Sequence, residues 1–286
     1  MMKVTQAFDA FLRRLEPRAE EAASASRQKD EVIAKLQKGL HPKEGMLSGS
    51  FGRRTAVRPL HDIDLFVVLG ADSGFAEQPP ATCLKRVAAV LREAYPQVDP
   101  QPGFRSVHLG KVPGGVDFDV VPAVEVPGQS GVFKIPDRDV HQWIRTNPWK
   151  HQELCNAADA TAQSKFRPIL KMLKRWRDLH GVPIRSFLLE AISYKAFPQA
   201  PDRYPDGLAH LFQFVGERVP QPCPDPAGLG SRVDAGMDPN RRQQTSERLL
   251  GAARDAANAL KAEREGDLTT AHRLWGKLLG ADYHAE

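Results

Sequence analysis

Cysteine is scarce in this 286-residue sequence, and the few that occur follow no structural pattern. The three are Cys83, Cys155 and Cys223, which lie far apart and form no CxxC pair. This spacing argues against a disulfide framework and against a zinc site, and it is compatible with a reducing compartment. We therefore expect a cytoplasmic protein.

Long apolar runs and a strong charge excess are also missing. No stretch approaches the roughly 18 consecutive apolar residues of a membrane-spanning helix, and the charged N-terminal residues argue against a signal peptide. We expect no membrane association. The 40 basic and 35 acidic side chains leave a net charge of +5, which suits an anionic ligand without demanding nucleic acid. Hydrophobic residues make up 41%, enough for a folded core.

The most informative segment is a predicted buried strand over residues 62–69 that carries Asp62 and Asp64. Residues two apart in a strand share a face, so the two carboxylates point the same way beside an apolar wall. This arrangement is costly unless the carboxylates are paired or bind a cation. Mg²⁺ prefers oxygen ligands and is commonly held by carboxylates together with substrate phosphates. The alternative is a pair of exposed carboxylates at a strand edge.

A short turn precedes this strand. Gly49 lets the backbone approach a ligand closely, and Ser50 adds a hydroxyl and an N–H that can hold phosphate oxygens. A basic segment with Arg53, Arg54 and Arg58 links the turn to the strand. The order of turn, basic segment and paired aspartates indicates a site for a metal and a phosphorylated ligand.

A second predicted strand, residues 116–122, supplies a third carboxylate. Asp117 and Asp119 share one face of it, and both are candidates. Phosphoryl transfer with two metal ions needs the ions about 4 Å apart, one on the attacking and one on the leaving oxygen. Two aspartates on one strand and one on its neighbour can hold such a pair.

Downstream, the sequence predicts a helix over residues 165–180, with Gly181 just after its end. Lys171 and Lys174 are three residues apart and share one of its faces, where a solvated basic surface is the simplest interpretation. Ser186 is a natural N-cap for the next helix.

The remaining periodicity favours helices separated by short strands and loops. Pro17 is expected to interrupt the first helical segment. Residues 123–150 read as a loop-rich region. The expected helices cover residues 3–38, 82–95, 151–165, 208–218, 241–265 and 267–279, and a further strand covers residues 104–110.

The run G-S-F-G-R-R-T-A-V-R-P-L-H-D-I-D-L-F-V-V-L resembles the nucleotidyltransferase superfamily that includes DNA polymerase β, CCA-adding enzymes and oligoadenylate synthases. It is most similar to the bacterial cGAS/DncV-like nucleotidyltransferases, which make cyclic oligonucleotide signals. The sequence departs from that pattern at Arg54, where relatives often have glycine.

The resemblance implies a set of catalytic acids. In the family, the third carboxylate immediately precedes an apolar pair and a proline, as in D-V-V-P, which favours Asp119 over Asp117. Asp62, Asp64 and Asp119 are then the expected ligands of Mg²⁺, with Mn²⁺ as a substitute.

The resemblance also implies a phosphate-binding set. The L-K-x-L-K-R-W segment is similar to the helix whose lysine holds the donor triphosphate, with Lys174 the better match and Lys171 the second. Ser186 is expected to bond the terminal phosphate, and Gly49 and Ser50 to cradle the phosphate chain.

The fold implied by the resemblance is α+β. A polymerase β-like core with a mixed sheet and helices is expected over residues 1–150, including a long N-terminal helix. An oligoadenylate synthase-like helical domain is expected over residues 151–286, with the active site in the cleft between the two.

The implied reaction joins nucleoside triphosphates into a cyclic di- or trinucleotide for antiphage (CBASS-type) signalling and releases pyrophosphate. The alternatives are an enzyme that extends RNA or makes linear oligonucleotides, and a non-catalytic nucleotide-binding module. The expected partners are nucleoside triphosphates, with no obligatory nucleic acid and with room for a regulatory protein.

Overall fold

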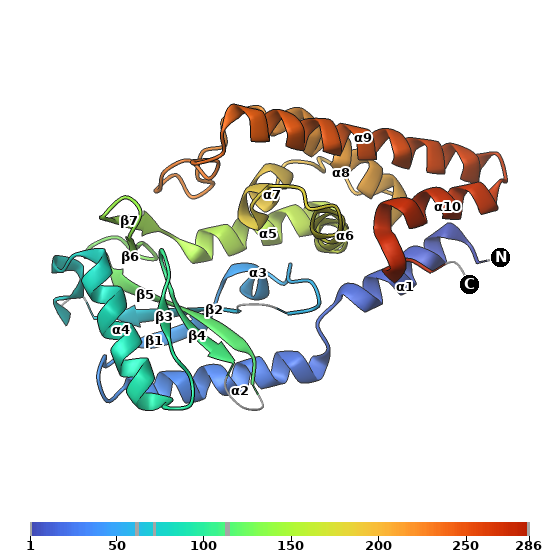
Figure 1. Cartoon of the computed structure of the whole chain (residues 1–286). Coiled ribbons are helices and arrows are strands. Elements are labelled where there is room, and N and C mark those ends of the chain that lie inside the picture. The colour runs from blue at the N-terminus through green and yellow to red at the C-terminus, as the bar shows by residue number, and fades with distance from the viewer. Residues whose placement is uncertain (1, 61–62, 71–72, 112–114, 285–286) are drawn as a thin grey trace. The chain divides into compact units, whose positions relative to one another are not determined.

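The computed structural model of the chain describes residues 2–60, 63–70, 73–111, 115–284 (Figure 1). These residues form two compact units, a sheet unit and a helical unit. The sheet unit comprises Pro17–Gln152 with Ala227–Gly230. The helical unit comprises Met1–Glu16, Glu153–Pro226 and Ser231–Glu286. Residues 2–16 therefore belong to the helical unit, whereas the expected division placed the whole N-terminal segment in the core.

The sheet unit is built on one mixed sheet. Its strand order is β1-β2-β5-β4-β3, and β6 and β7 continue from β5 as a hairpin. The β2–β5 pair is parallel and the other pairs are antiparallel. The strands are β1 (Glu44–Leu47), β2 (Ile63–Leu69), β3 (Gln101–Pro102), β4 (Val107–Lys111), β5 (Asp117–Glu125), β6 (Phe133–Asp137) and β7 (Gln142–Thr146).

The central strand β2 is covered on both faces. Ile63, Leu65, Val67 and Leu69 belong to one buried cluster, together with residues of α2 (Ala19–Leu36) and α4 (Pro80–Ala94). The opposite face carries Asp64 and then, further along, a smaller cluster that includes Phe66 and Val68. Burial on both faces explains why β2 reads as a nearly continuous hydrophobic run.

The region expected to be loop-rich contains the β6–β7 hairpin, so that expectation was wrong. Pro136 lies inside β6, and proline normally argues against a central strand. Here β6 pairs with β5 only through Phe133 and Lys134, so Pro136 lies where β6 has a single partner strand, β7. Trp149 stacks on Phe133 at a ring-centroid distance of 4.9 Å and so anchors the hairpin.

The helical unit follows the predicted periodicity closely. Asp267 caps the last helix by accepting a hydrogen bond from the Thr270 N–H, and Gly181 ends α6 with a φ of +58°. The first helical segment breaks around Pro17, as expected. The helices of this unit are α1 (Val4–Leu15), α5 (Pro148–Thr161, shared with the sheet unit), α6 (Phe166–Leu179), α7 (Ser186–Ser193), α8 (Tyr204–Arg218), α9 (Pro239–Arg264) and α10 (Leu268–Leu279).

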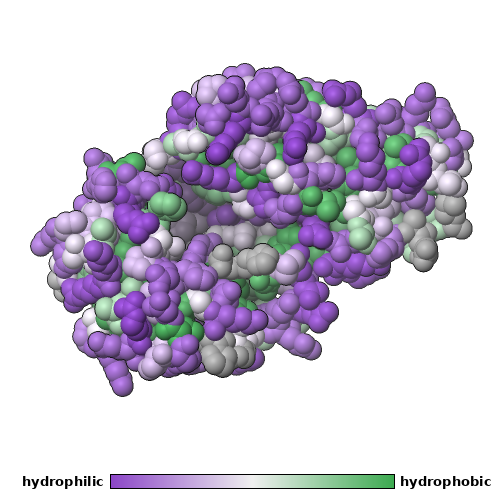
Figure 2. Space-filling model, viewed as in Figure 1, coloured by the Kyte–Doolittle hydropathy of each residue, from purple (hydrophilic) through white to green (hydrophobic). Residues whose placement is uncertain are grey.

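The face drawn in Figure 2 is predominantly polar. Figure 2 shows a face covered mainly by hydrophilic residues, with hydrophobic residues in small separate areas. Across the described part of the chain, no helix combines the length and apolar character needed to cross a bilayer.

The segment between α8 and α9 is held by one buried carboxylate, Asp234. It accepts hydrogen bonds from the Arg232 Nε at 3.0 Å and the Cys223 N–H at 3.0 Å, and it pairs with Arg242 of α9. The hydrogen bonds from Arg232 and then Arg242 hold the pKa of Asp234 well below its ordinary value. The charged form is therefore favoured in the folded state.

Replacing Asp234 with asparagine should lower the free energy of unfolding at pH 7 by about 1.5–3 kcal/mol, the scale of hydrogen bonds to a charged group. The stabilisation by Asp234 is complete above the unfolded pKa near 4 and is lost as the pH falls toward the lower folded pKa. Urea unfolding between pH 7 and 2 should show a weaker acid dependence in Asp234→Asn. Equal acid dependence in wild type and variant would contradict this account, and the exposed Asp202→Asn is the control.

Candidate active site

Two of the predicted catalytic carboxylates lie side by side on the sheet. In the parallel β2–β5 ladder, Asp64 is directly opposite Asp119. Paired residues of adjacent strands point to the same face, and this face is opposite the one that buries Ile63 and Leu65. Two carboxylates in this position repel each other, which a divalent cation would relieve.

Asp62 lies outside the described residues. Within the described ranges, no group of three histidine, cysteine, aspartate or glutamate side chains is arranged to hold a metal ion. The donors that are described nevertheless fit a hard cation. Asp64 and Asp119 supply carboxylate oxygens from neighbouring strands, and β2 begins one residue after Asp62.

Asp117, the other candidate for the third acid, occupies a different position. It pairs with Lys111 of β4, two residues before the Asp64–Asp119 pair. Its Oδ1 atom is buried and has no hydrogen-bond partner among the residues that the structure describes. An unpartnered buried carboxylate oxygen is unusual and suits a place where a cation binds. The register puts Asp119, rather than Asp117, next to Asp64.

The Gly49–Ser50 turn contacts the carboxylate of Asp64. Both residues belong to the single-turn helix α3 (Gly49–Gly52), and the Ser48 N–H donates to the Asp64 carbonyl at 2.8 Å. A Cβ atom on Gly49 would lie 1.6 Å from Asp64 Oδ2, and Gly49 has a φ of +57°. Only glycine fits between the turn and the carboxylate.

Arg54 follows this turn in a left-handed conformation, with a φ of +60°. This is the position at which the sequence departs from the glycine common in similar proteins. A non-glycine residue pays roughly 1–2 kcal/mol for this conformation. The turn therefore adopts a left-handed conformation at Arg54 although this residue is not glycine.

His108 is a site neighbour that the sequence pattern did not single out. It lies opposite Asp119 in the antiparallel β4–β5 ladder, and its Nδ1 is 3.3 Å from Asp119 Oδ1. The only sequence signal was its place in the alternation of strand 104–110, between Val107 and Leu109. Strand pairing, which alternation does not reveal, brings it to the acidic face.

The predicted phosphate-binding lysines belong to the helical unit, and both are buried. The Lys171 Nζ donates to Glu16 at 2.8 Å, and Lys174, 4% exposed, pairs with the fully buried Glu190 of α7. The expectation of a solvated basic face on this helix was therefore wrong, because Glu16, just after α1, and Glu190 of α7 supply acidic partners. A role for either lysine in phosphate binding remains a prediction.

Ser186 is the first residue of α7 rather than its N-cap, which is Arg185. The expected capping bond is replaced by a hydrogen bond from Arg177 Nη1 to Ser186 Oγ at 2.5 Å. Arg177 continues the three-residue spacing of Lys171 and Lys174 on α6. This spacing could have identified Arg177 from the sequence as a third basic residue on the same helix face.

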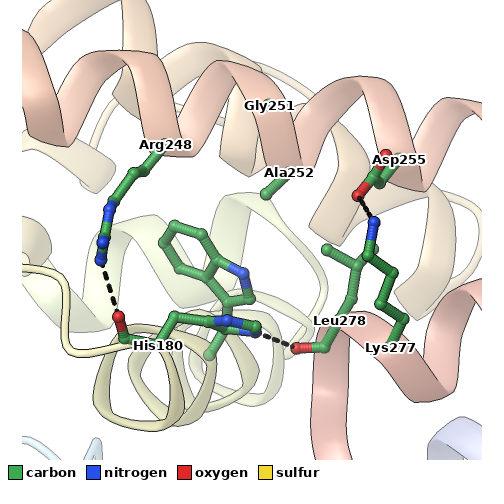
Figure 3. A pocket seen from close by; sticks show the side chains of 8 residues that line it. His180, Arg248, Gly251, Ala252, Asp255, Lys277 and Leu278 are labelled. Carbon is green, nitrogen blue, oxygen red and sulfur yellow. Dashed lines mark hydrogen bonds and ion pairs between the residues drawn. The ribbon is translucent and has the colours of Figure 1, made fainter.

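One pocket of about 280 Å³ lies within the helical unit, lined by residues of α9 and α10 and by the end of α6 (Figure 3). Its polar groups bond to one another. Arg248 donates to the His180 carbonyl at 2.7 Å, the His180 Nε2 lies 2.9 Å from the Leu278 carbonyl, and Lys277 pairs with Asp255 at 3.1 Å. These contacts stabilise helix packing, and none of the predicted site residues lines the pocket.

A family comparison agrees with this arrangement. The model of the Second Messenger Oligonucleotide or Dinucleotide Synthetase domain matches residues 2–158, more than half of the chain. The chain belongs to this family. The matched span contains β2, β5 and the Gly49–Ser50 turn.

Individual proteins support the same assignment. The chain is 27% identical over 255 residues to a cyclic AMP-AMP-AMP synthase of Acinetobacter sp., an alignment that covers 82% of this chain and 71% of that protein. It is 26% identical over 178 residues to the CBASS oligonucleotide cyclase CdnC of Escherichia coli, covering 58% of this chain and 56% of the relative.

Solved structures share the fold. The Escherichia coli MS115-1 CdnC in its complex with HORMA-deltaN superposes with a TM-score of 0.78 at 20% identity and covers 98% of both chains. The Vibrio cholerae DncV cyclic AMP-GMP synthase, described as a prokaryotic cGAS homolog, gives 0.75 at 11% identity over 99% of this chain and 98% of that one. The predicted α+β nucleotidyltransferase fold and the cGAS/DncV-like family are confirmed.

Substituting Gly49 with alanine should abolish turnover, because the new Cβ would collide with Asp64 Oδ2. Gly128→Ala is a matched control in the same unit: its φ is +75°, but nothing lies within 4 Å of an added Cβ. Both variants should lose stability by roughly 1–2 kcal/mol from the left-handed backbone. Turnover and thermal unfolding should be measured together, and equal activity of the two folded variants would contradict the contact.

Lys174→Ala should destabilise the helical unit by about 3–5 kcal/mol, because it leaves the Glu190 charge buried without its partner. The double variant Lys174→Met with Glu190→Gln removes both charges and should recover most of that loss. Chemical unfolding tests this, and a loss under 1 kcal/mol in Lys174→Ala would show that the pair contributes little. The double variant then permits a test of triphosphate affinity in a folded protein.

Proposed function

We propose that this protein is a divalent-metal-dependent nucleotidyltransferase that joins nucleoside triphosphates into a cyclic di- or trinucleotide and releases pyrophosphate. The observation that carries the proposal is the placement of Asp64 beside Asp119, with Gly49 against Asp64, in a chain of the synthetase family. The product serves CBASS-type antiphage signalling.

In each step, a ribose hydroxyl of one nucleotide attacks the α-phosphorus of a nucleoside triphosphate. An O–P bond forms, the bond between the α-phosphorus and its bridging oxygen breaks, and pyrophosphate leaves. Repetition and ring closure give the cyclic product. The protein contributes mainly positioning and stabilisation of charge.

Asp62, Asp64 and Asp119 would hold the metal, which we propose to be Mg²⁺, with Mn²⁺ as a substitute. When bound, the ion supplies positive charge to the phosphate oxygens and to the attacking oxygen. Asp119 lies beside Asp64 on the neighbouring strand, and we propose that its carboxylate also accepts the proton of the attacking hydroxyl.

The triphosphate would bind next to these acids. Gly49 permits close approach of backbone to ligand, and the Ser50 hydroxyl and N–H suit phosphate oxygens. In the helical unit, Lys174, Lys171 and Ser186 are proposed as phosphate ligands on the basis of the family resemblance alone. Both lysines form ion pairs, and Ser186 accepts a hydrogen bond from Arg177. Phosphate binding would therefore require phosphate oxygens to replace these partners.

The relatives suggest the substrate and the regulation. Similarity to a cyclic AMP-AMP-AMP synthase supports ATP as a substrate. The complex of CdnC with HORMA-deltaN supports control by a regulatory protein. We place the reaction in the cytoplasm, where nucleoside triphosphates are available.

Incubation with an equimolar mixture of four triphosphates and Mg²⁺, followed by phosphatase treatment and mass spectrometry, tests the reaction. A phosphatase-resistant cyclic product is expected. A linear or RNA-attached product would favour the alternative of an RNA-extending or linear-oligonucleotide enzyme.

Asp64→Asn and Asp119→Asn should each reduce product by more than about 100-fold, because even partners of metal ligands contribute 10–100-fold. Asp139→Asn, at an exposed position of the same unit, should leave turnover unchanged. Retention of turnover in a folded Asp64→Asn variant would refute the assignment.

A further inference from the structure

His108, Asp119 and Asp64 form a row across three adjacent strands. The sheet order places β5 between β2 and β4, and the registers align Asp64 with Asp119 and Asp119 with His108. The His108 Nδ1 lies 3.3 Å from Asp119 Oδ1, and the imidazole is 45% exposed. Asp119 therefore has a second carboxylate on one side and an imidazole on the other.

The sequence of β4 directs His108 to this face. Val107 and Leu109 are fully buried in the cluster on the opposite face, so the side chain between them projects toward the acids. The register shifts immediately after His108, between His108 and Gly110, and Gly110 has a φ of +83°. Such bulges re-aim side chains and are enriched next to active sites.

A hydrogen bond to one carboxylate oxygen limits rotation of the group. An Nδ1–H donated to Asp119 Oδ1 would fix the orientation of the carboxylate with respect to Asp64. Carboxylates that bind metals are commonly held by such outer partners, whose loss costs 10–100-fold in metal affinity or activity. His108 contacts Asp119 and needs no contact with the nucleotide to act in this way.

We propose that His108 is a positioning residue that orients the carboxylate of Asp119 for metal binding and nucleotidyl transfer. This inference rests on the proposed function, because it assumes that Asp119 is a metal ligand. His108 belongs neither to the paired-aspartate segment nor to the strand of Asp119, so the inference adds a new residue to the proposed site.

The test compares His108→Ala with His108→Asn, whose side-chain N–H can take the place of Nδ1–H. His108→Ala should lower kcat by 10–100-fold with a change in the KM for ATP of less than about twofold. His108→Asn should recover most of the lost kcat. Lys111→Ala, on the same strand but opposite Asp117, should keep wild-type kcat.

A second readout does not depend on turnover. Mn²⁺ binding is followed by electron paramagnetic resonance in the presence of a non-hydrolysable ATP analogue. His108→Ala should bind Mn²⁺ about 10-fold more weakly and His108→Asn nearly as well as wild type. Thermal unfolding of each variant establishes that the fold is intact.

The outcomes separate the two proposals. If wild type turns over and Asp119→Asn does not, but folded His108→Ala keeps full kcat and Mn²⁺ affinity, the positioning role is overturned and the proposed function stands. The positioning role is also overturned if His108→Asn recovers neither kcat nor Mn²⁺ affinity. If Asp119→Asn is fully active, the proposed function itself fails.

Discussion

The candidate site depends on the parallel pairing of β2 with β5. This ladder places two carboxylates next to each other on a sheet whose opposite face is an apolar core. The repulsion between them is a cost that hydrophobic burial on the other face of the same strands must outweigh. A bound cation would remove that cost, so the proposed site would be unfavourable without its ligand and favourable with it.

The neighbouring elements restrict that carboxylate pair on several sides. Gly49 closes against Asp64 so tightly that no side chain fits, and β4 brings His108 to Asp119. The backbone contact at Gly49 and the strand register thus leave the carboxylates of Asp64 and Asp119 little rotational freedom. If a ligand binds at the proposed site, little conformational entropy would be lost, which is the advantage of a preorganised site.

In the helical unit, the basic side chains of α6 are paired with polar or acidic groups of neighbouring segments. Lys171, Lys174 and Arg177 follow one row of α6, and their partners are Glu16 at the end of α1 and two residues of α7. The buried Lys174–Glu190 pair compensates charges that would be very costly alone. If these cations bind phosphate, binding exchanges one set of oxygen partners for another, and the acidic partners then set the affinity.

Local patterns in the sequence were sufficient to predict most helices and the central strands. These features depend on side-chain periodicity, capping residues and glycine positions, all of which act over a few residues. The family resemblance rested on short segments along nearly the whole chain, of which the Gly49–Leu69 run and the Asp119 strand were the most specific, and the family assignment and fold are confirmed. Asp62 itself lies outside the described residues.

Tertiary structure alone decided which groups meet. The β6–β7 hairpin forms despite Pro136, because pairing along the edge of the sheet tolerates it. Strand pairing between distant segments brings Asp119 next to Asp64 and His108 next to Asp119. Packing between distant helices buries Lys174. Periodicity specifies the face on which a residue lies, whereas register and packing partners depend on the free energy of the whole fold.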